Sequence, residues 1–165
     1  MILYLVRHGI AVNHTDPNCP PEIDRYLTRE GIKKTREVAE GVHAIGMRPT
    51  VFISSPYVRA TQTAEIFAEV FEFSRDKIRE SAELRPGSSP SEFMNDLANV
   101  KAREVIVFGH APHLDQLIAH AVGARGIFTA LKKAGIAALE FESVAAGKGT
   151  LAGLFPPKVL RQLDT

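Results

Sequence analysis

The sequence predicts an α/β fold, a three-layer sandwich in which helices flank a mostly parallel central sheet. Short apolar runs alternate with helical patterns along the 165 residues, which is typical of this class. Two of the runs, residues 2–6 and 104–108, are continuous and partly β-branched, as expected for strands that are buried on both faces of a parallel sheet. A chain of this length predicts a single domain, residues 1–165.

The first strand, residues 2–6, is followed by a segment in which Pro and Asn are dense. This segment, residues 13–26, is predicted to be a surface loop. Thr28 is expected to cap a helix that ends near Gly46. Four apolar residues roughly follow the helical spacing of that segment: Ile32, Val38, Val42 and Ile45.

The middle of the chain predicts a second strand and two further helices. The strand covers residues 50–54, and Pro56 is expected in the first turn of a helix that runs through Phe71. The signal for an element around Ile78 is weak. Ser89 and Pro90 are expected to start a helix that ends near Val100. The apolar side of the helix that runs through Phe71 carries Ala60, Ala64, Phe67 and Ala68.

The remaining elements follow the clear strand at residues 104–108. Pro112 is expected to open a helix through Val122. Two late strands, residues 137–141 and 150–155, flank a glycine-rich turn.

Composition excludes several classes of function. Twenty basic and nineteen acidic residues leave a net charge of +1 with no dense basic run, so nucleic acid is not an expected partner. No apolar stretch approaches the roughly 20 residues of a membrane-spanning helix, so no membrane association is expected. Cys19 is the only cysteine and cannot form an internal disulfide. The apolar run at the start of the sequence is interpreted as a strand and not as a signal peptide. Both observations favour a cytoplasmic location.

Reactive side chains follow three of the predicted strands. Arg7 and His8 follow the first, Arg59 lies on the first turn of the helix after the second, and His110 follows the strand 104–108. In open sheets of this kind, ligands bind in the crevice outside the carboxyl ends of the strands. Taken singly, each residue has a structural alternative: an ion pair for Arg7, a solvated helix position for Arg59, a hydrogen-bonded loop or buried group for the histidines.

Together these residues supply what phosphoryl transfer requires. Two guanidinium groups and an imidazolium, His110, can bind the equatorial oxygens of a phosphoryl group, because catalysis of this transfer is largely positioning and electrostatic stabilisation. His8 is then expected to attack phosphorus through a neutral ring nitrogen and form a phosphohistidine intermediate that water hydrolyses. The scheme predicts no metal or other cofactor. Asn13, in the loop after His8, is a further candidate for binding the phosphate.

Four ordered motifs now carry a resemblance to a known family. The segments LVRHG, LTREG, SSPYVRATQTA and FGHAP are similar to the histidine phosphatase, or phosphoglycerate mutase-like, superfamily over nearly the whole chain. The short length, the lack of a cap insertion and the late segment KKAGIA resemble the SixA-type phosphohistidine phosphatases. The resemblance implies that His8 is the nucleophile and that Arg7, Arg59 and His110 form the phosphate pocket.

One departure from the family pattern bears on the substrate. Many larger members carry a proton-donating glutamate two residues after a leucine in mid-chain, and here Pro86 occupies that place. Glu83 lies on the other side of Leu84 and is interpreted as a surface carboxylate. An alkoxide leaves poorly without an acid, whereas a protonated ring nitrogen leaves as neutral imidazole, so a P–N substrate is favoured.

Three functions remain open at this point. The leading one is a protein phosphohistidine phosphatase acting on a histidine phosphotransfer domain or a phosphocarrier. The others are a broad phosphomonoesterase for small phosphorylated molecules and a phosphate-binding module without turnover. His113 and Asp115 are interpreted as helix-capping residues, and Arg25 and Lys132 as candidates for receiving an acidic protein surface.

Overall fold

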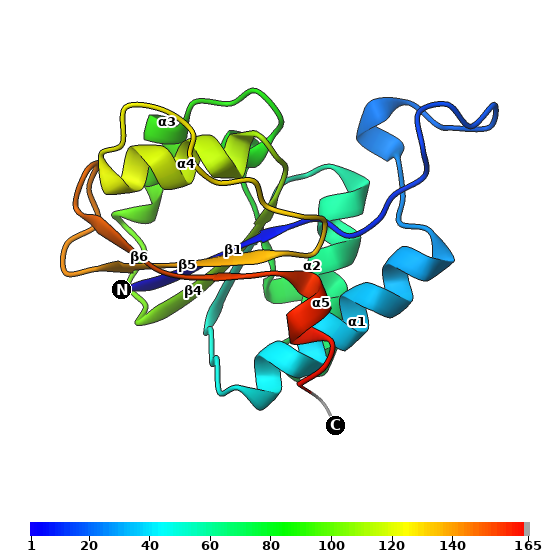
Figure 1. Ribbon diagram of the computed structural model, residues 1–165, viewed down its shortest axis with the longest axis horizontal. Coiled ribbons are helices and arrows are strands. Elements are labelled where there is room, and N and C mark those ends of the chain that lie inside the picture. The colour runs from blue at the N-terminus through cyan, green and yellow to red at the C-terminus, as the bar shows by residue number, and fades with distance from the viewer. Residues whose placement is uncertain (164–165) are drawn as a thin grey trace.

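The computed structural model describes residues 1–163 and has a six-stranded sheet with helices on both faces (Figure 1). The strand order is β3-β2-β4-β1-β5-β6. Strands β1 to β4 are parallel, and β5 and β6 are antiparallel additions at one edge. The predicted three-layer, mostly parallel sandwich is confirmed. The prediction of one domain over 1–165 stays a prediction, and residues 164–165 lie outside the described part.

The strands are β1 (Ile2–Arg7), β2 (Val51–Ser54), β3 (Arg79–Glu80), β4 (Glu104–Gly109), β5 (Ile136–Phe141) and β6 (Gly149–Phe155). The helices are α1 (Arg29–Ala44), α2 (Val58–Val70), α3 (Pro90–Leu97), α4 (His113–Val122) and α5 (Pro157–Leu160). Three short 3₁₀ helices are η1 (Glu22–Asp24), η2 (Arg75–Lys77) and η3 (Ala82–Leu84).

Two hydrophobic cores lie on opposite faces of the sheet. In β1, Leu3 and Leu5 pack into the core under α3 and α4, and Tyr4 and Val6 pack into the core under α1, α2 and α5. Successive side chains of a strand point to opposite faces, so a strand covered on both sides must be apolar at every position. This double burial explains the unbroken apolar run of β1 and fixes its carboxyl end, where Arg7 begins the functional loop.

The start of α1 agrees with the prediction, but its buried face differs. Thr28 Oγ1 accepts a hydrogen bond from Gly31 N at 2.9 Å, as expected of a capping residue. Ile32 and Ile45, however, are exposed. The inward position belongs to Gly31, because a Cβ there would lie 2.0 Å from Ile10 O, and the helix packs directly on the loop after β1.

Several helix boundaries also differ from the sequence-based expectation. Tyr57 is the N-cap of α2, so Pro56 precedes the helix, and α3 ends at Leu97 rather than near Val100. Pro112 is the N-cap of α4, one residue before its first turn. The weak element near Ile78 is η2 followed by the two-residue edge strand β3. Within residues 1–163, no helix combines the length and apolar character needed to cross a membrane.

Candidate active site

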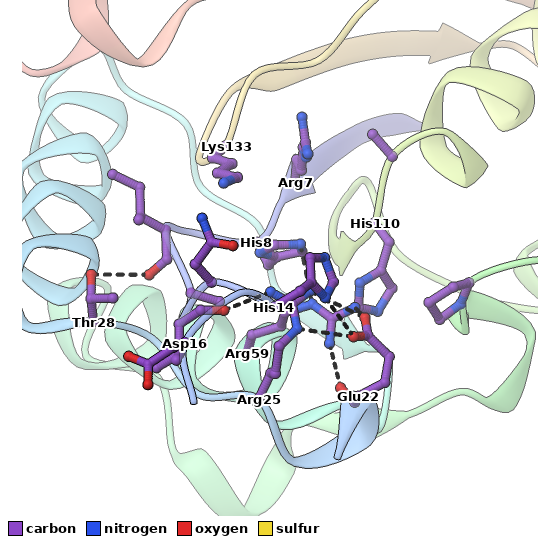
Figure 2. A pocket seen from close by; sticks show the side chains of 16 residues that line it. Arg7, His8, His14, Asp16, Glu22, Arg25, Thr28, Arg59, His110 and Lys133 are labelled. Atoms are coloured by element: carbon purple, nitrogen blue, oxygen red, sulfur yellow. Dashed lines mark hydrogen bonds and ion pairs between the residues drawn. The ribbon is translucent and has the colours of Figure 1, made fainter. Parts of the chain in front are cut away.

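The carboxyl ends of β1, β2 and β4 open into a cavity of about 670 Å³, which we call the strand-end cavity (Figure 2). Its lining includes all five residues that the sequence singles out for the site: Arg7, His8, Asn13, Arg59 and His110. These residues come from three segments far apart in the chain: the end of β1 with the loop after it, the first turn of α2, and the residue after β4. The segments meet because the carboxyl ends of parallel strands lie at the same end of the sheet. The predicted gathering of the two arginines and two histidines is therefore observed.

His8 is held in a neutral form suited to nucleophilic attack. Its Nδ1 lies 2.7 Å from Gly9 O, and since a carbonyl only accepts, Nδ1 carries the proton and Nε2 keeps its lone pair. Nε2 accepts a long hydrogen bond of 3.3 Å from Arg59 Nε inside the cavity. Burial, opposed by the Gly9 carbonyl and reinforced by the charges of Arg59 and Arg7, lowers the pKa of His8 to about 3.

His110 faces His8 with its ring centroid 5.3 Å away. Its Nε2 lies 2.8 Å from Ser55 Oγ, and its buried Nδ1 has no hydrogen-bond partner within residues 1–163. Burial and the positive charge of Arg59 lower the pKa of His110 to about 2. His110 is therefore neutral in this structure, and the expectation that it binds phosphoryl oxygens as an imidazolium stays a prediction.

The two arginines are fixed rather than solvated. Arg59 is 3% exposed and donates through Nη1 to Glu22 O and through Nη2 to Glu22 Oε1, both at 2.8 Å. Arg7 Nη1 donates to Leu131 O at 2.8 Å, and its buried Nε has no partner in the described chain. The structural alternatives considered for these two residues, a solvated helix position and an ion pair, are not observed. Both guanidinium groups line the cavity in preset orientations.

Sequence reasoning missed Glu22, which sits across the cavity from β1 (Figure 2). Its Oε2 accepts from Arg25 Nε at 3.0 Å and lies 3.4 Å from His14 Nδ1. The Arg25 guanidinium holds the pKa of the Glu22 carboxyl below its usual value. A charged carboxylate therefore occupies the Arg59 fork. In the sequence, the only signal for the contact between Arg25 and Glu22 is their spacing of three residues.

Arg25 does not face outward to receive a partner, as its sequence position suggested. It is 8% exposed and donates through Nη1 to Val12 O at 2.8 Å. Its remaining nitrogens bind Glu22. Arg25 thus ties η1 to the loop after β1, while Lys132 is exposed as expected.

Other motif residues form the frame of the site. Thr63 Oγ1 accepts from Gly9 N at 3.0 Å and donates to Arg59 O at 2.7 Å. Gln62 Oε1 accepts from Leu27 N at 2.7 Å. The segment SSPYVRATQTA therefore has two tasks, since Arg59 faces the cavity while Gln62 and Thr63 hold the loops that carry His8.

The capping interpretation of His113 and Asp115 is wrong, because neither side chain caps α4. Asp115 is 3% exposed and accepts from Thr129 Oγ1 at 2.7 Å and Leu131 N at 3.1 Å. His113 is buried with no hydrogen-bond partner at either ring nitrogen among the described residues. Asp115 therefore fixes the position of Leu131, whose carbonyl oxygen accepts the hydrogen bond from Arg7. Through this contact Asp115 helps to orient Arg7.

The region expected to supply an acid holds Pro86, which lines the cavity, whereas Glu83 does not. The acidic side chains that line it within the described chain are Asp16 and Glu22. Asn13 lies at the exposed rim, where its Oδ1 accepts from Thr15 N at 3.0 Å. Residues 1–163 contain no cluster of three or more His, Cys, Asp or Glu side chains that could hold a metal ion. Metal-independent catalysis stays a prediction.

Comparison with known proteins gives consistent relatives. A family model described as histidine phosphatase superfamily (branch 1) matches residues 3–87, just over half of the chain. An uncharacterized protein of Picosynechococcus is 34% identical over 143 residues, covering 84% of each chain. The structure of the protein histidine phosphatase SixA complexed with tungstate superposes with a TM-score of 0.83 at 22% identity, over 96% of this chain and 98% of that one.

A second solved structure shows the same fold with a different substrate. Phosphoserine phosphatase from Entamoeba histolytica superposes with a TM-score of 0.72 at 16% identity, over 96% of this chain and 98% of that one. Similarity at these identities establishes the fold. The substrate has to be argued from the site itself.

Proposed function

This chain belongs to the histidine phosphatase superfamily, and from its site we propose that it is a protein phosphohistidine phosphatase whose nucleophile is His8. The observation that carries the proposal is the state of His8: neutral, with the proton on Nδ1, and with Nε2 accepting only a long hydrogen bond from Arg59 in a cavity that Arg7 also lines. A neutral imidazole beside fixed cations is ready to attack phosphorus without first losing a proton.

The proposed reaction has two steps. The phosphoryl group enters the strand-end cavity and displaces the Glu22 carboxylate from Arg59. Arg59 Nε then donates to a phosphoryl oxygen instead of His8 Nε2, which frees the Nε2 lone pair. His8 Nε2 attacks in line, the P–N bond to the substrate histidine breaks, and the substrate imidazole leaves with a proton from solvent. Water then attacks the phosphorylated His8 and releases inorganic phosphate. The guanidinium groups of Arg7 and Arg59 bind the equatorial oxygens throughout.

His110 changes its charge when phosphate binds. In this structure its pKa is lowered to about 2, chiefly by burial. A phosphoryl dianion beside it acts in the opposite direction, because a nearby negative charge favours the protonated imidazole. His110 therefore becomes a charged donor to the phosphoryl group only when the group is present.

The lack of a proton-donating carboxyl group at Pro86 and Glu22 supports a substrate with a P–N bond rather than an ester. Pro86 stands where larger relatives carry a glutamate, and Glu22 is held ionised by Arg25. An ionised carboxylate donates no proton to a leaving alkoxide. The imidazole of phosphohistidine needs less help, because it leaves as a neutral ring once protonated.

A substrate panel tests the proposal. Purified protein is incubated with a phosphohistidine peptide, para-nitrophenyl phosphate and several sugar phosphates, and released phosphate is measured. We expect kcat/KM for the phosphohistidine peptide to exceed that for each sugar phosphate by at least about 100-fold, the scale at which a missing acid slows ester cleavage. Equal or faster ester turnover would show a general phosphomonoesterase, and no release from any compound would show a binding module. The His8→Ala variant measures the background.

A further inference from the structure

A second cavity, of about 460 Å³, shares Arg7, Ile10 and Lys133 with the strand-end cavity. Its other walls are the first half of α1, the segment before β5, and α5. We call it the basic groove, because six of its lining side chains are cationic and none is acidic: Arg7, Lys34, Lys132, Lys133, Lys158 and Arg161.

The charge of the groove is only partly compensated. Lys34 pairs with Glu30, and Arg161 Nη1 lies 3.6 Å from Glu37 Oε2. The exposed side chains of Lys132, Lys133 and Lys158 make no ion pair with any acid of residues 1–163. The whole chain carries a net charge of only +1, so this local excess is not a consequence of a basic composition.

We propose that the basic groove binds acidic residues next to the phosphorylated histidine of the substrate protein. This inference rests on the proposed function. Because the two cavities are joined at Arg7 and Lys133, a chain whose phosphoryl group reaches His8 has its neighbouring residues over the groove. The ligand is therefore a set of Asp or Glu carboxylates on the same polypeptide as the phosphohistidine.

The kind of cation favours an acidic protein segment over a small polyanion. A phosphate site in this molecule has buried, hydrogen-bonded arginines, as Arg59 shows. The groove instead presents exposed lysines on flexible stems from two separate segments, at Lys132 and Lys158. Lysine acts as a mobile point charge rather than a fixed fork, which suits carboxylates spread over several residues.

Charges of this kind act mainly on encounter with the substrate. Exposed charges at the rim of an interface change the association rate and its salt dependence more than the chemical step. The basic groove should therefore lower KM for an acidic phosphoprotein at low salt and leave kcat nearly unchanged. Substrates too small to reach the groove should show no effect.

Two synthetic phosphohistidine peptides test the proposal, one flanked by Glu residues and the other by Gln at the same positions. For the wild type at low salt we expect kcat/KM to be about 10-fold higher for the acidic peptide, through KM, as a few rim charges would give. In the Lys132→Gln/Lys158→Gln double variant the ratio should fall to about 2-fold or less. Turnover of para-nitrophenyl phosphate should be unchanged, which also shows that the variant folds.

A matched control removes two lysines at the opposite end of the strands. Lys101 precedes β4 and Lys148 precedes β6, next to the end of β5, so both lie away from the carboxyl ends of the parallel strands. The Lys101→Gln/Lys148→Gln variant has the same net charge as the groove variant and should keep the wild-type ratio. Equal loss in both variants, a wild-type ratio near one, or a ratio that survives in the groove variant would each overturn the proposal.

A separate arm does not depend on phosphohistidine turnover. The acidic peptide without its phosphoryl group should inhibit hydrolysis of para-nitrophenyl phosphate at low salt, and the groove variant should abolish this inhibition. If neither phosphohistidine peptide is hydrolysed but inhibition behaves as expected, the proposed substrate is wrong while the groove still binds acidic chains. If inhibition is absent or unchanged in the variant, the groove proposal is wrong whatever the substrate.

Discussion

The strand-end cavity and the basic groove share Arg7 but hold their cations in opposite ways. In the cavity, Arg59 is 3% exposed and all three of its donor groups are already engaged. In the groove, Lys132 and Lys158 are exposed and have no acidic partner in the described chain. The fold therefore fixes the cation of the cavity in place, whereas the cations of the groove lie on exposed, mobile side chains.

This difference separates two contributions to catalysis. Donors fixed before the substrate arrives stabilise a transition state, because they need no reorganisation during the reaction. Mobile surface charges raise the local concentration of an oppositely charged partner. We therefore expect changes in the cavity to alter kcat strongly and changes in the groove to alter KM moderately.

The largest effect is expected from Arg59. Arg59→Ala should reduce kcat/KM by about 100- to 1,000-fold, or about 3 to 4 kcal/mol, as for removal of one preorganised donor. Arg59→Lys should recover little of this, because an ammonium group cannot reproduce the fork that contacts both Glu22 and His8. Steady-state kinetics on a phosphohistidine peptide measures both. Arg36→Ala, at a partly exposed position of α1 whose side chain pairs with Glu69, is the matched control and should be near wild type. Full activity of Arg59→Lys would show that charge alone suffices.

Acid should destabilise the cavity. The pKa values of His8 and His110 are about 3 and 2 in the folded state and about 6.5 in the unfolded chain, so the unfolded state binds more protons below pH 6.5. The free energy of unfolding should fall between pH 7 and pH 5 by about 2 kcal/mol per buried histidine, at about 1.4 kcal/mol per pH unit.

Urea unfolding at the two pH values measures this loss. His110→Asn should lose part of the sensitivity to acid, because His110 is one of three buried histidines, with His8 and His113, whose pKa is lowered by burial. His14→Asn changes an exposed histidine at the same cavity and should keep the wild-type sensitivity. A flat stability profile from pH 7 to pH 5 would show that the two histidines are not held neutral.

The smallest of these effects is expected from Glu22. Its carboxylate occupies Arg59 Nη2 at 2.8 Å, so Glu22→Gln should tighten inhibition by inorganic phosphate by about 3- to 10-fold, equivalent to about 1 kcal/mol. Glu30→Gln, which removes an exposed acid of α1, should leave the inhibition constant unchanged. Weaker phosphate binding in Glu22→Gln would mean that the carboxylate orients Arg59 rather than competing with the substrate.

The sequence is most informative where local pattern and chemistry coincide. The apolar runs of β1 and β4 predict buried strands, and the reactive residues at their ends, His8 and His110, are found facing one another. The strands are legible because burial on both faces requires apolar residues throughout. The gathering of the site then follows from the geometry of a parallel sheet.

Features set by long-range packing could not be predicted in the same way. Ile32 is exposed because Gly31 takes the inward position against Ile10, a contact between segments about 20 residues apart. Asp115 looks like a capping residue in the sequence but binds Leu131 N across a loop. The role of Glu22 also needs the fold, since its partner Arg59 lies on another helix. Each case depends on a partner that no local pattern identifies.

Trapping the phosphoenzyme tests the central claim most directly. The protein is mixed with a phosphohistidine peptide, quenched rapidly under alkaline conditions that preserve phosphohistidine, digested and mapped by mass spectrometry. We expect one phosphoryl group on the peptide that contains His8, localised to that residue, and none in the His8→Ala variant. A phosphoryl group on another residue, or wild-type turnover by His8→Ala, would contradict the account.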